Sequence, residues 1–339
     1  MSRLFSIPLL VAATFFAGAQ AQADIEVLTS IKPLQLIAAA VQDGMGKPAV
    51  LLPPGASPHH YALRPSDVRQ VRSADLLYWI GPDMEAFLAP VLEGRKSPSV
   101  AVQSMPGLTL RHFGDAAGEN GHGHDVAHDD ADKPAGQDGE DHEDHAHAAA
   151  DGHGEAHDEH DHNHRPGSLD AHLWLLPANA MVIAEGMARD MAEADPDNAE
   201  RYQANLAAFK QRLGALDEQL DRRLGAIRTR PFFVFHEAYE YFEAAYGIRH
   251  AGVLSAGGEA QPGARHVAAM RERLEQAGPS CVFYEPPVRP RLTDSLTRGL
   301  PVKVAALDAL GYGIDPSAGA YEQLIDHLGS SLAGCLESL

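Results

Sequence analysis

The sequence predicts an α/β protein of two lobes, each built on a parallel-rich sheet covered by helices. Short strand-like runs alternate with helix-like stretches on both sides of a long acidic segment, and this alternation is typical of parallel sheets with helices on both faces. A continuous helical pattern between the two series predicts one connecting helix. Without a leader and the acidic segment, about 265 of the 339 residues remain, which suits two domains.

The first series contains four strand-like runs and three helix-like stretches. We expect strands at 25–29, 49–52, 75–80 and 99–103, and helices at 34–41, 65–71 and 84–92. The N-terminal lobe predicted from them spans 24–194 and includes a loop at about 115–165.

The connecting helix is expected at 195–228. Asp195 and Pro196 supply an N-cap and a first-turn proline. Apolar residues then recur every three or four positions, at Tyr202, Leu206, Phe209, Leu213, Leu216, Leu220, Leu224 and Ile227. At 1.5 Å per residue the helix would be roughly 48 Å long. A coiled-coil dimer is the competing interpretation, but neat charge pairing beside the apolar stripe is missing, so a strut packed along both lobes is favoured.

The second series begins directly after this helix. Strands are expected at 232–235, 251–254, 281–284 and 302–307, again with helices between them. They predict a C-terminal lobe at 229–339.

The N-terminus has the pattern of a cleaved secretory signal. A basic start is followed by an apolar run from Leu4 to Phe16 and a small-residue site at 21–23. We therefore expect 1–23 to be removed, a mature chain beginning at Asp24, and a soluble, exported protein. The apolar run is short for a membrane helix, and no later run reaches roughly twenty residues.

Two cysteines, Cys281 and Cys335, are the only ones in the chain. In an oxidising compartment a disulfide is the simplest prediction, and the chain-entropy estimate of its stabilisation is about 4 kcal/mol. Two buried free thiols, or a thiolate metal site, are the alternatives. A thiolate site usually shows closer spacing.

Eleven histidines lie in the 44 residues from Gly121 to His164, interleaved with carboxylates. Neutral imidazole binds zinc, copper and nickel, so this density predicts metal capture. The segment contains one large aliphatic residue, Val126, so we expect a loop without a packed core. A solubilising linker with incidental histidines is the alternative. The predicted auxiliary, low-affinity ligands are His122, His124, His128, His142, His145, His147, His153, His157, His160, His162 and His164.

Most of the net charge of −20 belongs to this segment. From Asp115 to Asp161, sixteen acidic residues stand against Lys133 alone, which gives −15. The remainder has no basic run, so nucleic acid is excluded as an expected partner.

Three histidines outside the segment occupy positions from which an α/β lobe can present a ligand. His59 follows a strand and a proline-rich turn, His172 follows the acidic segment, and His236 ends the run Phe232–Phe235. Ligands gather beyond the carboxyl ends of parallel strands, which favours His236 most. Each histidine taken alone is equally compatible with a structural role.

The residues around these histidines favour a metal-binding role over a structural one. The chain resembles the zinc-binding periplasmic receptors of bacterial ABC importers, the ZnuA-like members of the cluster that binds zinc or manganese. The resemblance covers the whole mature chain and rests on the motifs at 58–61, 64–67, 172–175, 235–239, 261–263 and 281–286, together with the long helix, the paired cysteines and the histidine-rich segment. It implies two lobes joined by a rigid helix, with one metal ion in the cleft between them.

The resemblance also implies the ligands. The three family histidines correspond to His59, His172 and His236, and the fourth position to Asp308. A water molecule or His60 could take that fourth position, because Pro58 stands where some zinc receptors have a glutamate. Three imidazoles with at most one carboxylate suit zinc, whereas manganese favours more oxygen ligands.

The implied function is high-affinity capture of zinc and its delivery to a membrane ABC permease with its ATPase, by a monomer that a periplasmic zinc chaperone could load. A zinc buffer or metallochaperone and a receptor for manganese or another divalent metal are the alternatives. An enzyme is not expected: His236–Glu240 begins like the His-Glu-x-x-His helix of metalloproteases, but residue 240 is glutamate.

Overall fold

The computed structural model describes residues 25–114, 167–255 and 262–339. The predicted signal sequence and the eleven histidines of the histidine-rich segment lie outside these ranges. Within them, no helix combines the length and the apolar character needed to cross a membrane.

Two parallel four-stranded sheets form the framework, as predicted. The first has the order β2-β1-β3-β4, from β1 (Val27–Thr29), β2 (Ala49–Val50), β3 (Leu76–Trp79) and β4 (Ser99–Ala101). The second has the order β6-β5-β7-β8, from β5 (Phe232–Val234), β6 (Gly252–Val253), β7 (Ser280–Tyr284) and β8 (Val302–Ala306). All eight expected strands are present, most of them shorter than the apolar runs that predict them.

Helices cover both sheets. Those of the first lobe are α1 (Lys32–Val41), α2 (Pro65–Ser73), α3 (Ala89–Leu92) and α4 (Pro177–Ala194), and those of the second are α6 (Glu240–Tyr246), α7 (Ala264–Ala277), α8 (Arg291–Thr297) and α9 (Ala320–Leu336). Short 3-10 turns occur at η1 (Ala86–Leu88), η2 (Val102–Ser104), η5 (Leu173–Leu175) and η6 (Pro196–Asn198). The helix expected at 84–92 is therefore divided into η1 and α3.

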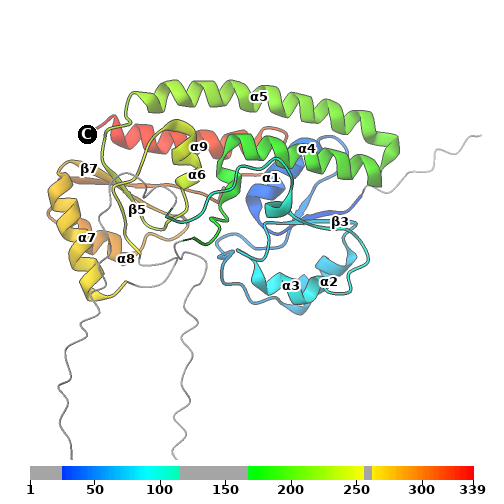
Figure 1. Ribbon diagram of the computed structural model, residues 1–339, viewed down its shortest axis with the longest axis horizontal. Helices are drawn as coiled ribbons and strands as arrows, with labels where there is room; N and C mark the ends of the chain where they lie inside the picture. Colours follow the sequence, from blue (N-terminus) through cyan, green and yellow to red (C-terminus); the bar gives the residue numbers. More distant parts are fainter. Residues whose placement is uncertain (1–24, 115–166, 256–261) are drawn as a thin grey trace, which may run out of the picture.

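The connecting helix α5 (Ala199–Gly225) runs along both lobes (Figure 1). Its 27 residues give a length of about 40 Å. It packs against α1 and α4 on one side of the molecule and against α9 and α6 on the other, which confirms the strut. Its apolar stripe, including Tyr202, Phe209 and Leu220, is buried.

The start of this helix differs from the prediction. Asp195 precedes the 3-10 turn η6, and its side chain caps no backbone N–H. Its Oδ2 instead accepts hydrogen bonds from the Tyr202 hydroxyl at 3.0 Å and the Asn198 side chain at 2.7 Å. Asp195 therefore fixes the turn between α4 and α5 through side chains.

A disulfide joins Cys281 in β7 to Cys335 in α9, with 6.2 Å between the Cα atoms. It ties the C-terminal helix to the second sheet, as the sequence predicts. The same helix packs against α1 and α5, so the link also fixes the part of the second lobe nearest the first.

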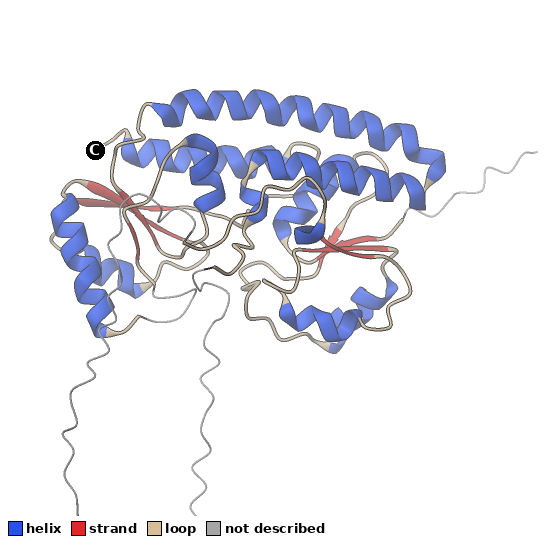
Figure 2. Ribbon diagram, in the orientation of Figure 1, coloured by secondary structure: helices blue, strands red, loops and turns tan. Residues whose placement is uncertain are grey.

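The apolar core is continuous from one lobe to the other. One cluster contains Leu28 and Leu77 of the first sheet, Phe209 of α5, and Phe232 and Phe283 of the second sheet. A separate, smaller cluster lies under α7 and α8 and includes Phe233, Met270 and Leu296. Figure 2 shows the strands at the two ends of the molecule with the long helices above them.

Candidate metal centre

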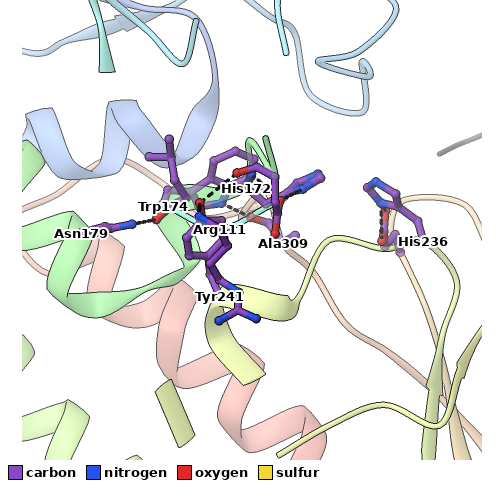
Figure 3. Close-up of polar contacts among 10 residues, drawn as sticks. Arg111, His172, Trp174, Asn179, His236, Tyr241 and Ala309 are labelled. Carbon is purple, nitrogen blue, oxygen red and sulfur yellow. Dashed lines mark hydrogen bonds and ion pairs between the residues drawn. The ribbon is translucent and has the colours of Figure 1, made fainter. Parts of the chain in front are cut away.

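Three histidines from both lobes converge at one point. His59 lies in the loop between β2 and α2, His172 immediately before η5, and His236 just after β5. One ring nitrogen of each lies within 4.8 Å of the others, and within the described residues this is the only group of three or more histidine, cysteine or acidic side chains with that spacing. The ring centroids are 5.0 to 5.6 Å apart. The structure thus brings the three predicted histidines together, and Figure 3 shows two of them, His172 and His236.

The cluster is shielded from solvent. Exposed fractions are 9% for His59, 2% for His172 and 5% for His236. Burial lowers the pKa of His172 well below its usual value, and the nearby His236 lowers it further. The His172 ring is therefore neutral at physiological pH, which is the form that binds a metal ion.

Asp170 orients the His172 ring. Its Oδ1 lies 2.8 Å from His172 Nδ1 and accepts a second hydrogen bond, of 3.0 Å, from the His172 backbone N–H. The Trp174 indole, which donates to the Ala309 carbonyl at 2.9 Å, packs beside the histidine. Because the carboxylate accepts from Nδ1–H, the lone pair of the neutral ring is on Nε2.

Glu285 holds His236 in the same way. Its Oε1 lies 3.1 Å from His236 Nδ1 and also accepts a hydrogen bond of 3.2 Å from the Tyr239 hydroxyl. His236 follows β5 and Glu285 follows β7, which are neighbours in the second sheet. The chain leaves these strands in opposite directions along the sheet, and this is the point where α/β proteins bind ligands.

A stiff turn carries His59. Pro53 and Pro54 precede Gly55, whose φ of +80° is strained for any side chain. A Cβ at Gly55 would also lie 3.2 Å from Pro287 of the second lobe. The two lobes therefore touch beside the histidine cluster, and glycine permits this close approach.

Asp308 and His60 stand apart from the cluster. The carboxylate of Asp308 accepts hydrogen bonds from the backbone N–H groups of Leu310, Gly311 and Tyr312. Burial raises the pKa of Asp308, and these hydrogen bonds oppose that shift. His60 is exposed, with its ring 6.4 Å from that of His59. The identity of the fourth ligand stays a prediction.

Sequence reasoning missed two functional neighbours of the histidines. Asp170 stands two residues before His172, and Glu285 follows a strand next to the one before His236. Carboxylates that hold metal-binding imidazoles are common, so the Asp170-x-His172 spacing was a usable signal. The partnership between Glu285 and His236 depends on strand order, which no local pattern contains.

Comparisons with known proteins give a consistent result. The family profile described as ZnuA, zinc-uptake complex component A, periplasmic, matches residues 27–335. The chain is 35% identical to the high-affinity zinc uptake system protein ZnuA of Yersinia pestis, over 97% of this chain and 96% of that protein. It is 34% identical to the protein of the same description from Brucella abortus, over 95% of each. A solved ZnuA crystal structure superposes with a TM-score of 0.68 at 20% identity, covering 92% of this chain and 99% of that one.

Proposed function

Since the chain belongs to the ZnuA family, the periplasmic components of high-affinity zinc uptake systems, we propose that His59, His172 and His236 are the ligands of the zinc ion it takes up. It is a zinc-binding transport protein and not an enzyme. The observation that carries the assignment is the convergence of three buried imidazoles from two lobes on one point.

The ligand chemistry supports zinc as the cargo. Zinc prefers four-coordinate sites with nitrogen or sulfur ligands, and three imidazoles supply three of those positions. Asp170 and Glu285 raise the basicity of two of the rings and fix their orientation. For the fourth position we propose Asp308 first, then water, then His60. To bind zinc, the Asp308 carboxylate would have to give up hydrogen bonds from backbone N–H groups. We therefore expect Asp308 to bind the ion weakly.

The transport partners, the export of the chain and the role of the histidine-rich segment are also proposals. The protein is a component of a zinc-uptake complex, and we propose that its partners are an ABC permease and the attached ATPase, to which a monomer delivers the ion. A periplasmic zinc chaperone that loads the site is a further candidate. We propose that the leader at 1–23 directs export, and that the histidine-rich segment at about 115–165 collects zinc with lower affinity than the cleft.

One measurement tests the ligand assignment. Zinc is titrated into the full chain and into His59→Ala, His172→Ala and His236→Ala, in competition with a chelator of known affinity. Each substitution should weaken the tightest site at least tenfold, because three nitrogens act as one chelate. Substitution of His266, which hydrogen-bonds backbone carbonyls of the second lobe outside the cluster, is the matched control. An unchanged tight site in His236→Ala would overturn the assignment.

A further inference from the structure

Two buried aromatic side chains hold the backbone on either side of Asp308. The hydroxyl of Tyr239 donates a hydrogen bond of 2.7 Å to the carbonyl of Leu307. The indole N–H of Trp174 donates one of 2.9 Å to the carbonyl of Ala309. Tyr239 is 1% exposed and Trp174 is fully buried. Residues 308–312, which we call the Asp308 turn, are therefore fixed on both sides of the aspartate.

The Tyr239 hydroxyl also contacts the carboxylate that holds His236. It lies 3.2 Å from Oε1 of Glu285, the same oxygen that lies 3.1 Å from His236 Nδ1. Burial raises the pKa of Tyr239 well above its usual value, and the charges of Glu285 and Asp308 raise it further, so the hydroxyl keeps its proton. This single proton is shared between Glu285 and the Leu307 carbonyl. Tyr239 thus connects the support of His236 to the backbone that leads into Asp308.

Trp174 makes the equivalent connection from His172. The centroids of the two rings are 5.4 Å apart, and Figure 3 shows Trp174 and Ala309 beside this histidine. The hydroxyl of Tyr321, in α9, donates to the Trp174 carbonyl at 2.6 Å, so the backbone of Trp174 is held from the second lobe as well. The Asp308 turn is therefore connected to the surroundings of two histidines of the cluster.

We propose that Tyr239 and Trp174 are positioning residues of the metal centre, which fix the Asp308 turn relative to His236 and His172 and thereby favour zinc over manganese. The proposal rests on the assignment of these histidines as zinc ligands. A fixed turn limits the fourth position to one ligand, as four-coordinate zinc requires. A loosened turn admits additional water molecules, and a larger shell with more oxygen ligands suits manganese better than zinc.

Removal of the Tyr239 hydroxyl tests the proposal on the full chain. Tyr239→Phe keeps the ring, and Tyr246→Phe is the matched control, because it removes an equally buried hydroxyl that donates to Asp217 of α5 at 2.9 Å. Each variant loses buried hydrogen bonding, so both should lose stability. In Tyr239→Phe, chelator competition should show zinc affinity reduced about three- to tenfold and manganese affinity within about twofold of wild type. Tyr246→Phe should retain both affinities.

Two further measurements distinguish positioning from a general loss of stability. The zinc-affinity losses of Tyr239→Phe and Glu285→Gln should combine less than additively in the double variant, because the hydroxyl acts on His236 through Glu285. Cobalt in place of zinc absorbs visible light more strongly when it is four-coordinate than when it is six-coordinate. This absorption should weaken in Tyr239→Phe and Trp174→Phe and stay unchanged in Tyr246→Phe.

The results also separate this proposal from the ligand assignment. A wild-type ratio of zinc to manganese affinity in Tyr239→Phe, a wild-type cobalt spectrum, or fully additive losses with Glu285→Gln would overturn the positioning role. None of these results would affect the loss of zinc affinity expected for His236→Ala. Wild-type zinc affinity in His236→Ala would instead overturn the ligand assignment on which the positioning role rests.

Discussion

Asp170 accepts a hydrogen bond from Nδ1 of His172 at 2.8 Å, and both side chains are almost completely buried. The same carboxylate oxygen accepts from the His172 backbone N–H, so the ring and the chain beneath it are fixed together. An imidazole held in this way loses less entropy when it binds a metal ion than a freely rotating one does.

Removal of the Asp170 carboxylate should weaken zinc binding without removing a ligand. Loss of a carboxylate behind a metal-binding histidine typically costs 10- to 100-fold in affinity, and we expect Asp170→Asn to fall in that range. Competition with a chelator measures it, and Glu285→Gln tests the equivalent contact to His236. Wild-type affinity in both variants would show that the histidines need no such support.

Replacement of Asp308 should have a smaller effect than replacement of any cluster histidine. Its carboxylate already accepts three backbone hydrogen bonds, and water can occupy the fourth zinc position. We expect Asp308→Ala to weaken zinc binding by about tenfold or less, which is less than the loss expected for a cluster histidine. A loss equal to that of His236→Ala would make Asp308 an obligatory ligand.

Loss of the disulfide should destabilise the fold and leave zinc affinity nearly unchanged. The bridge joins residues 54 positions apart, for which the chain-entropy estimate is about 4 kcal/mol. Cys281→Ser with Cys335→Ser should lower the unfolding temperature, while zinc affinity stays within twofold. Calorimetry measures the unfolding temperature and zinc titration of the same preparation measures the affinity. The single Cys335→Ser variant in reductant serves as control.

The pair formed by His250 and Glu243 should stabilise the fold most at low pH. Burial lowers the pKa of His250, but the hydrogen bond and charge of Glu243, together with the charges of Glu240 and Glu237, outweigh burial and raise it overall. A folded-state pKa above the unfolded value gives stability that is complete below about 6.5 and disappears as pH rises through the folded pKa. His250→Gln should therefore cost about 1.5–3 kcal/mol at pH 5.5 and less at pH 9, measured by urea unfolding. A destabilisation that grows with pH would contradict a raised pKa of His250 in the folded state.

Deletion of 115–164 should leave one tight zinc ion per chain and remove the weaker ones. Asp170 and Glu285 fix two histidines of the cleft, His172 and His236, and the deleted segment contains eleven other histidines. Binding by the segment should also fade as pH falls through about 6.5, because imidazole must be deprotonated to bind metal. Zinc titration of the full and the deleted chain at pH 7.5 and 5.5 measures the number and affinity of the sites. Loss of the tightest site on deletion would show that the histidine-rich segment, and not the cleft, is the primary zinc site.

The sequence predicted the strands, the strut and the three histidines because each has a local signal. Phe232 to Phe235 is a strongly apolar run, and the stripe from Tyr202 to Ile227 repeats with helical spacing. Helix α4 was missed although Pro177 marks its start and its alanines and methionines favour helix.

The contact between Glu285 and His236 joins distant segments. The order of the strands brings these two residues together across 49 positions of sequence, and no spacing along the chain encodes it. The hydrogen bonds to Asp308 are local, since the backbone N–H groups of Leu310, Gly311 and Tyr312 follow it within four residues.

The continuous core restricts how an ion can enter and leave. Leu28 of one lobe and Phe283 of the other belong to the same apolar cluster, and α5 is bound to both. Moving the lobes apart as jaws would expose that shared interior to water, at about 25 cal/mol for every Å² of apolar surface. An exchange of the ion that leaves this core closed therefore costs less free energy than a hinge motion of the two lobes.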